Sequence, residues 1–136
     1  MSKSDDEQFI RNQPRHRILV VDDSYETNLF FKMTLEQEGL YVETYSDPLE
    51  VVQTFEPNYY DLVLLDIRLP HMNGFELYKM LKEIDKSVKV CFITSFEAYY
   101  KSLVEEFDLD IKCFIRKPIQ KDELIKHVIE QLVTSE

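Results

Sequence analysis

The chain has 136 residues, 44% of them hydrophobic, which suits one compact domain. Acidic residues outnumber basic ones by 26 to 16, and the resulting net charge of -10 argues against a nucleic-acid backbone as the main partner. No apolar run approaches the length of a membrane span, and residues 1–14 lack the apolar stretch of a secretory signal. We therefore expect a cytoplasmic protein with neither a membrane nor a nucleic acid as direct partner.

The first half of the chain alternates between short apolar runs and helix-length amphipathic segments. Residues 1–14 are polar without a sustained period, which predicts a flexible tail, and the folded domain is expected to occupy residues 15–136. The predicted elements, in chain order, are a strand at Arg17–Val21, a helix from a Ser24 cap to Gly39 with apolar Leu29, Phe30, Met33 and Leu35, a strand at Tyr41–Tyr45, and a helix from Ser46-Asp47-Pro48 through Phe55.

The second half continues the same alternation. The predicted elements are a strand at Leu62–Asp66, a turn-rich loop from Leu69 to Gly74, a helix whose apolar face is Phe75, Leu77, Met80, Leu81 and Ile84, a strand at Val88–Ile93, a helix within Phe96–Phe107, a strand at Lys112–Arg116 and a helix over Lys121–Val133 with Leu124, Ile125, Val128, Ile129 and Leu132 inward. Five strands alternating with five helices predict an α/β fold with a doubly wound parallel sheet.

The two cysteines, Cys91 and Cys113, fall inside the fourth and fifth predicted strands. A thiol in such a position behaves as a small buried hydrophobic group. We expect both cysteines to be reduced and structural.

Polar residues stand where four of the predicted strands end. Asp22 and Asp23 follow the first strand, Asp66 ends the third, Thr94 follows the fourth and Lys117 follows the fifth. Ligands of parallel sheets bind beyond the carboxyl ends of the strands. The sequence therefore predicts that three carboxylates, a hydroxyl and an ammonium converge on one edge of the sheet.

The chemistry of this set favours a divalent cation and a phosphoryl group. Clustered carboxylates repel one another, and a cation relieves that repulsion. Oxygen ligands without histidine or cysteine suit Mg²⁺. A carboxylate can act as a nucleophile toward phosphorus, which makes Asp66 the natural acceptor, while Thr94 and Lys117 offer the donors that the phosphoryl oxygens require.

The pattern resembles the receiver domain of two-component response regulators, the CheY-like family, from Arg15 to Val133. The resemblance is carried by Asp22-Asp23, by Asp66-Ile67-Arg68-Leu69-Pro70 with Asn73-Gly74 behind it, by Thr94, and by Lys117-Pro118. It implies a flavodoxin-like sheet with the strand order 2-1-3-4-5.

The resemblance also implies a role for each matching residue. Asp66 would accept phosphate from a sensor histidine kinase or a histidine phosphotransfer domain. Mg²⁺ would be held by Asp22, Asp23, Asp66 and the backbone carbonyl of Arg68. Thr94 and Phe114 would move as switch residues after phosphorylation.

Four positions near the site depart from the commonest family pattern or vary within the family. Ser95 stands where alanine is frequent, and Phe114 stands where tyrosine is frequent. Arg68 and Phe96 occupy variable flanking positions. We hypothesise that these two bulky side chains shield the phosphoryl group from water and lengthen its lifetime.

Simpler interpretations exist for most of these residues. Asp66 could be a turn residue, and Asp22 and Asp23 could cap the first helix, although Ser24 is available for that. Thr94 could be an ordinary strand end and Lys117 could simply precede the turn at Pro118, whereas for Phe114 a plain core role is nearly as good as the switching role. Three histidines without ligand spacing, His16, His71 and His127, are expected at the surface or in turns.

The prediction is a stand-alone receiver that signals through a changed surface and is not an enzyme acting on a separate substrate. The family commonly uses the fourth helix, fifth strand and fifth helix to bind targets or to dimerise, and Tyr99 and Tyr100 could belong to that face or to the core. The alternatives are a phosphatase with an aspartyl-phosphate intermediate and an interaction module that works without phosphorylation. The phosphatase would need a second carboxylate as general acid and a substrate pocket.

Overall fold

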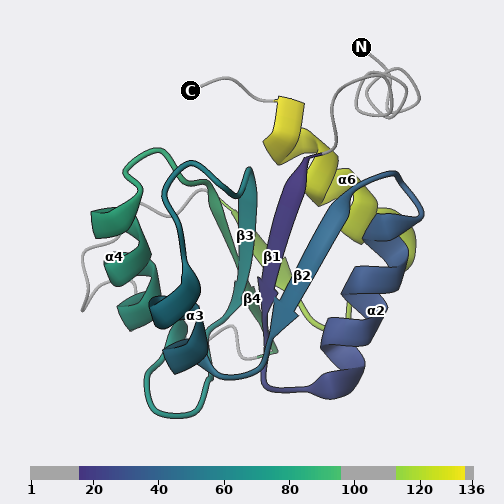
Figure 1. Cartoon of the computed structure of the whole chain (residues 1–136). Helices are drawn as coiled ribbons and strands as arrows, with labels where there is room; N and C mark the ends of the chain where they lie inside the picture. The colour runs from purple at the N-terminus through teal and green to yellow at the C-terminus, as the bar shows by residue number, and fades with distance from the viewer. Residues whose placement is uncertain (1–15, 96–112, 134–136) are drawn as a thin grey trace.

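A computed structural model describes residues 16–95 and 113–133 of the chain, and its centre is a five-stranded sheet. The strands are β1 (Arg17–Val21), β2 (Tyr41–Tyr45), β3 (Leu62–Asp66), β4 (Val90–Thr94) and β5 (Phe114–Arg116). They lie in the order β2-β1-β3-β4-β5, and every neighbouring pair is parallel (Figure 1). The predicted α/β class and strand order are confirmed.

Helices cover both faces of the sheet. The described residues form four helices, α2 (Tyr25–Glu36), α3 (Pro48–Thr54), α4 (Gly74–Ile84) and α6 (Lys121–Val133). Helices α2 and α6 lie on one face and α3 and α4 on the other, as Figure 1 shows. The helix predicted within 96–107 lies outside the described residues.

Alternation along the strands produces two apolar cores. On β1, Ile18 and Val20 join the core beneath α2 and α6, while Leu19 and Val21 join the core beneath α3 and α4. The central strand β3 is buried along its whole length. Burying one such side chain contributes roughly 1.5–3 kcal/mol to the free energy of folding. The two cores therefore stabilise the sheet whose strand ends carry the polar residues.

The helix starts follow the predicted capping residues. The Ser24 side chain accepts a hydrogen bond from the Thr27 N–H at 3.3 Å, and the Asp47 side chain accepts one from the Leu49 N–H at 2.9 Å. After α2 the chain turns at Gly39, whose φ of +85° is a conformation that glycine adopts without strain.

Two helices present apolar residues to solvent that the sequence pattern places on an apolar face. On α2, Phe31 and Leu35 are buried, whereas Leu29, Phe30 and Met33 are exposed. On α4, three of the predicted residues are buried, and Met80 and Ile84 are exposed. Helix existence was therefore predictable, but the inward face was only partly so.

The last two strands are shorter than predicted. Strand β4 begins at Val90 rather than Val88 and includes Thr94, because the Thr94 carbonyl accepts a hydrogen bond from the Lys117 N–H at 2.8 Å. The β5 strand begins at Phe114, after Cys113.

The expectation that the cysteines are reduced is wrong. Cys91 and Cys113 form a disulfide, and neither is a free thiol. The β4–β5 register pairs Phe92 with Phe114, so the residues before them face each other. The pairing depends on the register between β4 and β5, which the sequence pattern does not give.

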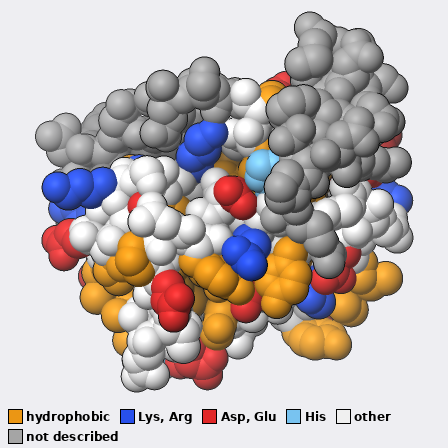
Figure 2. Space-filling view, turned by 45° about the horizontal axis from the view of Figure 1, so that its top comes forward, with side chains coloured by type: hydrophobic (Ala, Val, Ile, Leu, Met, Phe, Trp, Pro, Cys, Tyr) orange, Lys and Arg blue, Asp and Glu red, His pale blue; other side chains and the backbone are white. Residues whose placement is uncertain are grey.

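The surface charges and the lengths of the helices can be described for the same residues. In the face shown in Figure 2, acidic and basic side chains are interspersed among the described residues rather than gathered by sign. No helix in the described part is long and apolar enough to cross a membrane.

Candidate functional site

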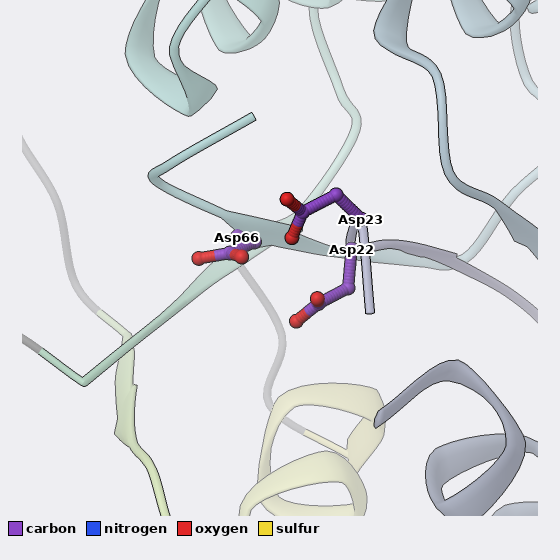
Figure 3. A group of neighbouring side chains, drawn as sticks. All are labelled: Asp22, Asp23 and Asp66. Carbon is purple, nitrogen blue, oxygen red and sulfur yellow. The ribbon is translucent and has the colours of Figure 1, made fainter. Parts of the chain in front are cut away.

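Three aspartates meet at the carboxyl end of the sheet. Asp22 and Asp23 follow β1, and Asp66 is the last residue of β3, the neighbouring strand. Each offers a carboxylate oxygen, and these oxygens lie within 4.8 Å of one another; Figure 3 shows the three side chains approaching a common space. Asp22 is fully buried and Asp66 is 6% exposed, while Asp23 is exposed.

Local hydrogen bonds fix the turn that carries the first two aspartates. The Asp22 Oδ1 atom accepts a hydrogen bond from the Ser24 N–H at 2.8 Å, so the residue that caps α2 also orients this carboxylate. The Asn28 side chain, buried at 7% exposure, donates through Nδ2 to the Asp22 carbonyl at 2.7 Å and the Tyr45 carbonyl at 3.5 Å.

Asn28 was not among the predicted site residues. A polar amide on the inward face of α2 was the available signal, because buried side-chain amides need specific partners. Its position ties the end of β1 to both α2 and β2.

Lys117 joins the acidic cluster from the loop after β5. Its Nζ atom donates a hydrogen bond to Asp22 Oδ2 at 2.9 Å and lies 3.6 Å from Asp66 Oδ2. The predicted convergence of the three carboxylates with the ammonium is thus present in the structure.

Burial and neighbouring charges shift the pKa of the Asp66 carboxyl group. Burial and the neighbouring Asp22 carboxylate raise its pKa to about 6, while Lys117 and a 3.3 Å hydrogen bond from the Arg68 N–H to Asp66 Oδ1 oppose the shift. Burial disfavours the charged form of Lys117, but the hydrogen bond to Asp22 and the charges of Asp66 and Asp22 raise its pKa overall. Lys117 therefore stays charged and offsets only part of the repulsion among the carboxylates.

The donor set fits a hard divalent cation. The cluster consists of carboxylate oxygens from Asp22, Asp23 and Asp66, the ligand type that Mg²⁺ prefers. None of the three histidines belongs to this group: His71 is an exposed loop residue with φ of +71°, and His16 approaches Asp61 at 3.5 Å at the opposite edge.

A cavity of about 430 Å³ lies beside Asp66. Thr94 lies in its wall and is almost completely buried. The full lining is Asp23, Asp66, Arg68, Leu69, Pro70, Thr94, Ser95 and Lys117. Most of the predicted phosphoryl-contacting and flanking residues therefore surround one space.

The loop between β3 and α4 is anchored where it passes Asp66. A β-carbon at Gly74 would overlap the Asp66 carbonyl oxygen, so the close approach of α4 to β3 requires glycine. Asn73 and Glu76 cap the helix reciprocally, with hydrogen bonds of 2.9 and 3.1 Å between side chain and backbone. The Asn73-Gly74 pair thereby positions the segment that contains Arg68.

The predicted switch residues lie on the last two strands. Thr94 ends β4, and Phe114 begins β5 as a half-buried ring whose centroid lies 5.8 Å from that of Phe92. Their movement on phosphorylation stays a prediction. Phe96, predicted to influence phosphoryl lifetime, lies outside the described residues, as do Tyr99 and Tyr100.

Comparisons with known proteins agree with the fold. The family model of the response regulator receiver domain matches residues 18–129. The response regulator receiver protein CpdR of Brucella abortus is 28% identical over 119 residues, which cover 88% of this chain and 98% of CpdR.

Two solved structures show the same architecture. The non-phosphorylated HemR receiver domain from Leptospira biflexa superposes with a TM-score of 0.80 at 31% identity, covering 90% of this chain and 98% of that one. The response regulator TrrA from Thermotoga maritima, solved with Mg²⁺ and beryllofluoride, gives a TM-score of 0.74 at 29% identity and covers 86% and 99%. This chain belongs to the receiver domain family of two-component response regulators.

Proposed function

We propose that this chain is a phosphorylation-controlled receiver in which Asp66 accepts a phosphoryl group from a phosphohistidine. The donor would be a sensor histidine kinase or a histidine phosphotransfer domain. The observation that carries the proposal is the position of Asp66 at a 430 Å³ cavity, next to two further carboxylates and 3.6 Å from the Lys117 ammonium.

The proposed transfer is a direct displacement at phosphorus. A carboxylate oxygen of Asp66 forms a bond to phosphorus, and the bond from phosphorus to the histidine nitrogen breaks. The imidazole leaves with the electron pair and takes up a proton. Lys117 and the Thr94 hydroxyl, which line the same cavity as Asp66, would donate hydrogen bonds to the transferred oxygens.

The acidic cluster would hold Mg²⁺ during this reaction. Its ligands would be the carboxylates of Asp22, Asp23 and Asp66 together with the backbone carbonyl of Arg68. The ion supplies positive charge that offsets the charge on the phosphoryl oxygens. Support comes from the three carboxylates that approach one another, from the burial and the Asp22 charge that raise the Asp66 pKa, and from the Mg²⁺ named in the TrrA complex.

An apolar surface beside the site suits the approach of the donor protein. A cavity of about 480 Å³ adjoins Lys117 and is lined in part by Phe30 of α2 and Ile119 of the loop before α6. Tyr25, 73% exposed, begins the same helix. A donor that packed against α2 would bury apolar area next to the acceptor, which favours this side for phosphohistidine docking.

Phosphorylation would act by shifting a population between two packings of the same domain. In the proposal, Thr94 and Phe114 move toward the phosphoryl group, and Arg68 and Phe96 limit its hydrolysis. The changed surface would comprise the predicted helix within 96–107, β5 and α6, and it would bind a downstream protein or a second copy of the chain.

Residues 15–136 are the proposed receiver domain. The phosphatase alternative has less support, since the carboxylates at the site are all accounted for as cation ligands and acceptor.

Treatment with acetyl phosphate and Mg²⁺, followed by intact mass measurement, tests the proposal. The wild-type protein should gain the mass of one phosphoryl group, and Asp66→Asn should gain none. Asp122→Asn, an exposed aspartate on α6, is the matched control and should behave as wild type. Uptake by Asp66→Asn, or steady turnover of an external phosphomonoester by the wild type, would contradict it.

A further inference from the structure

The disulfide between Cys91 and Cys113 joins β4 to the segment that enters β5. The two Cα atoms are 4.6 Å apart, within the range that disulfides span. The bond lies one position before the β4–β5 ladder, whose first pair is Phe92 with Phe114, and the Phe92 N–H donates to the Cys113 carbonyl at 3.0 Å.

Strand β5 is the element that depends most on this link. It has three residues, stands at the edge of the sheet and pairs only with β4 among the described strands. An edge strand this short is held by few backbone hydrogen bonds. A covalent link at its start therefore adds a large share of the restraint on its position.

The linked segments both lead into the acidic site. Cys91 stands three residues before Thr94, and Cys113 stands four residues before Lys117. The two segments meet again beyond the disulfide, where the Lys117 N–H donates to the Thr94 carbonyl at 2.8 Å. The disulfide and this hydrogen bond bracket β5, so the state of the sulfur atoms bears on how firmly Lys117 is held near Asp66.

We propose that Cys91 and Cys113 form a reversible redox modification site whose oxidant is a hydroperoxide. One thiol attacks the hydroperoxide; its O–O bond breaks, an alcohol leaves (water in the case of hydrogen peroxide), and a sulfenic acid forms. The second thiol then displaces water and forms the disulfide, so two thiols lose two electrons and two protons. A dithiol reductant reverses the reaction by thiol–disulfide exchange.

Burial selects the reagent class. Cys91 is fully buried and Cys113 is 5% exposed, which favours a small oxidant over a protein catalyst. The sulfur pair is also remote from the aspartate carboxylates in sequence and belongs to the core beneath α2 and α6, so oxidation changes no ligand of the site directly.

The consequence for phosphorylation rests on the proposed function. In the oxidised form, β5 keeps Lys117 beside Asp22 and Asp66, the arrangement seen in the structure. In the reduced form, β5 is held by its ladder, by the packing of Ile115 and by the Lys117–Thr94 hydrogen bond, without the covalent link, and it opens more often. We expect acetyl phosphate and Mg²⁺ to phosphorylate Asp66 at least about three times faster in the oxidised protein than in the reduced protein. This ratio of rates corresponds to a difference of about 0.7 kcal/mol in activation free energy.

The experiment compares the 136-residue chain in its two redox states. Alkylation under denaturing conditions and intact mass measurement count the thiols before and after hydrogen peroxide or dithiothreitol. Hydrogen exchange of the β5 amides and the initial phosphorylation rate are then measured on each form. The variants are Cys91→Ala, Cys113→Ala and the double variant, each with a melting curve to establish folding.

The inference predicts that peroxide closes the disulfide, that dithiothreitol opens it, and that oxidation slows β5 amide exchange and speeds phosphorylation. The folded variants should show the rate of the reduced form in both reagents. A disulfide that does not form or cannot be reduced in the native protein overturns the inference, as do equal β5 exchange or equal phosphorylation rates in the two states. If neither form takes up phosphate, the proposed function fails, while thiol counts and β5 exchange still decide the redox site.

Discussion

Two aspartates of similarly low exposure at opposite edges of the sheet show how the surroundings of a carboxylate decide the direction of its pKa shift. Asp66 at the carboxyl edge and Asp85 at the amino edge are 6% and 5% exposed. Burial and the Asp22 charge raise the Asp66 pKa to about 6. Burial also opposes ionisation of Asp85, but hydrogen bonds from Asn58 and Ser87 lower its pKa.

The difference lies in what each carboxylate faces. Asp85 accepts hydrogen bonds from the Asn58 N–H at 2.9 Å and from the Ser87 N–H and hydroxyl at 3.1 and 2.8 Å, so its negative charge is well satisfied. Asp66 faces other carboxylates and accepts one longer backbone hydrogen bond, at 3.3 Å. The hydrogen bonds at the amino edge stabilise the charge of Asp85, whereas the negative charges clustered at the carboxyl edge would be offset by a bound cation.

The largest change in stability should come from substitution of Asp85. Asp85→Ala should lower the free energy of unfolding by about 3 kcal/mol, because three part-buried hydrogen bonds to the carboxylate, from the Asn58 N–H and from the Ser87 N–H and hydroxyl, are lost. Urea unfolding measures the loss. Among folded molecules, phosphorylation by acetyl phosphate should keep its wild-type rate, and a loss of that rate would contradict the division between the two edges.

Removing the charge of Asp66 should stabilise the protein, in contrast to the loss of Asp85. Asp66→Asn should raise the free energy of unfolding of the metal-free protein at pH 7 by about 2 kcal/mol, because it removes one of the mutually repelling charges. Urea unfolding in a chelator tests this, with Asp122→Asn as control. Added Mg²⁺ should stabilise the wild type by mass action and stabilise Asp66→Asn less. A lower free energy of unfolding for Asp66→Asn would contradict the claim that repulsion among the carboxylates destabilises the metal-free protein.

The stability contributions of Asp66 and Asp85 should depend on pH in opposite directions. The pKa of Asp66 in the folded protein, about 6, exceeds the unfolded value of about 3.9, so the folded state holds this proton more tightly. Its contribution to stability is therefore greatest below pH 4, falls as pH rises from 4 to 6 and is constant above that, spanning up to about 3 kcal/mol. For Asp85, whose pKa is lowered, the contribution is present above pH 4 and is lost as pH falls.

Unfolding curves of the wild type and Asp66→Asn between pH 4 and pH 8 without metal isolate this contribution. The stability difference between the two proteins should shrink toward pH 4. A difference that is independent of pH would mean that Asp66 does not titrate in this window.

The smallest effect should come from Asn28. Asn28→Ala should weaken Mg²⁺ binding about fivefold, close to 1 kcal/mol, because the turn that carries Asp22 and Asp23 loses its hydrogen bond to α2. Titration calorimetry measures the affinity. Met33→Ala, an exposed residue on the same helix, should leave it unchanged, and equal effects of both substitutions would point to helix stability instead.

Much of the fold was predictable because local patterns and global packing agree. Strands β1, β2 and β3 and helix α6 have the predicted bounds, since each is a continuous apolar run or a periodic amphipathic segment with clear flanking residues. Strands β4 and β5 were less predictable, because their ends depend on hydrogen bonds between the two strands rather than on their own side chains. The inward face of α2 also required the fold, since Leu29 and Phe31 differ in burial but not in chemical type.

The sequence by itself determined the alternating elements and the acidic and basic groups at the strand ends, because apolar periodicity and the geometry of a parallel sheet bring those ends to one edge. Only the tertiary structure decided the Cys91–Cys113 disulfide, the ion pair of Lys117 with Asp22 and the amide contacts of Asn28. Each of these depends on distances of a few ångströms between residues far apart in the chain, which strand register and helix rotation set and which no local pattern encodes.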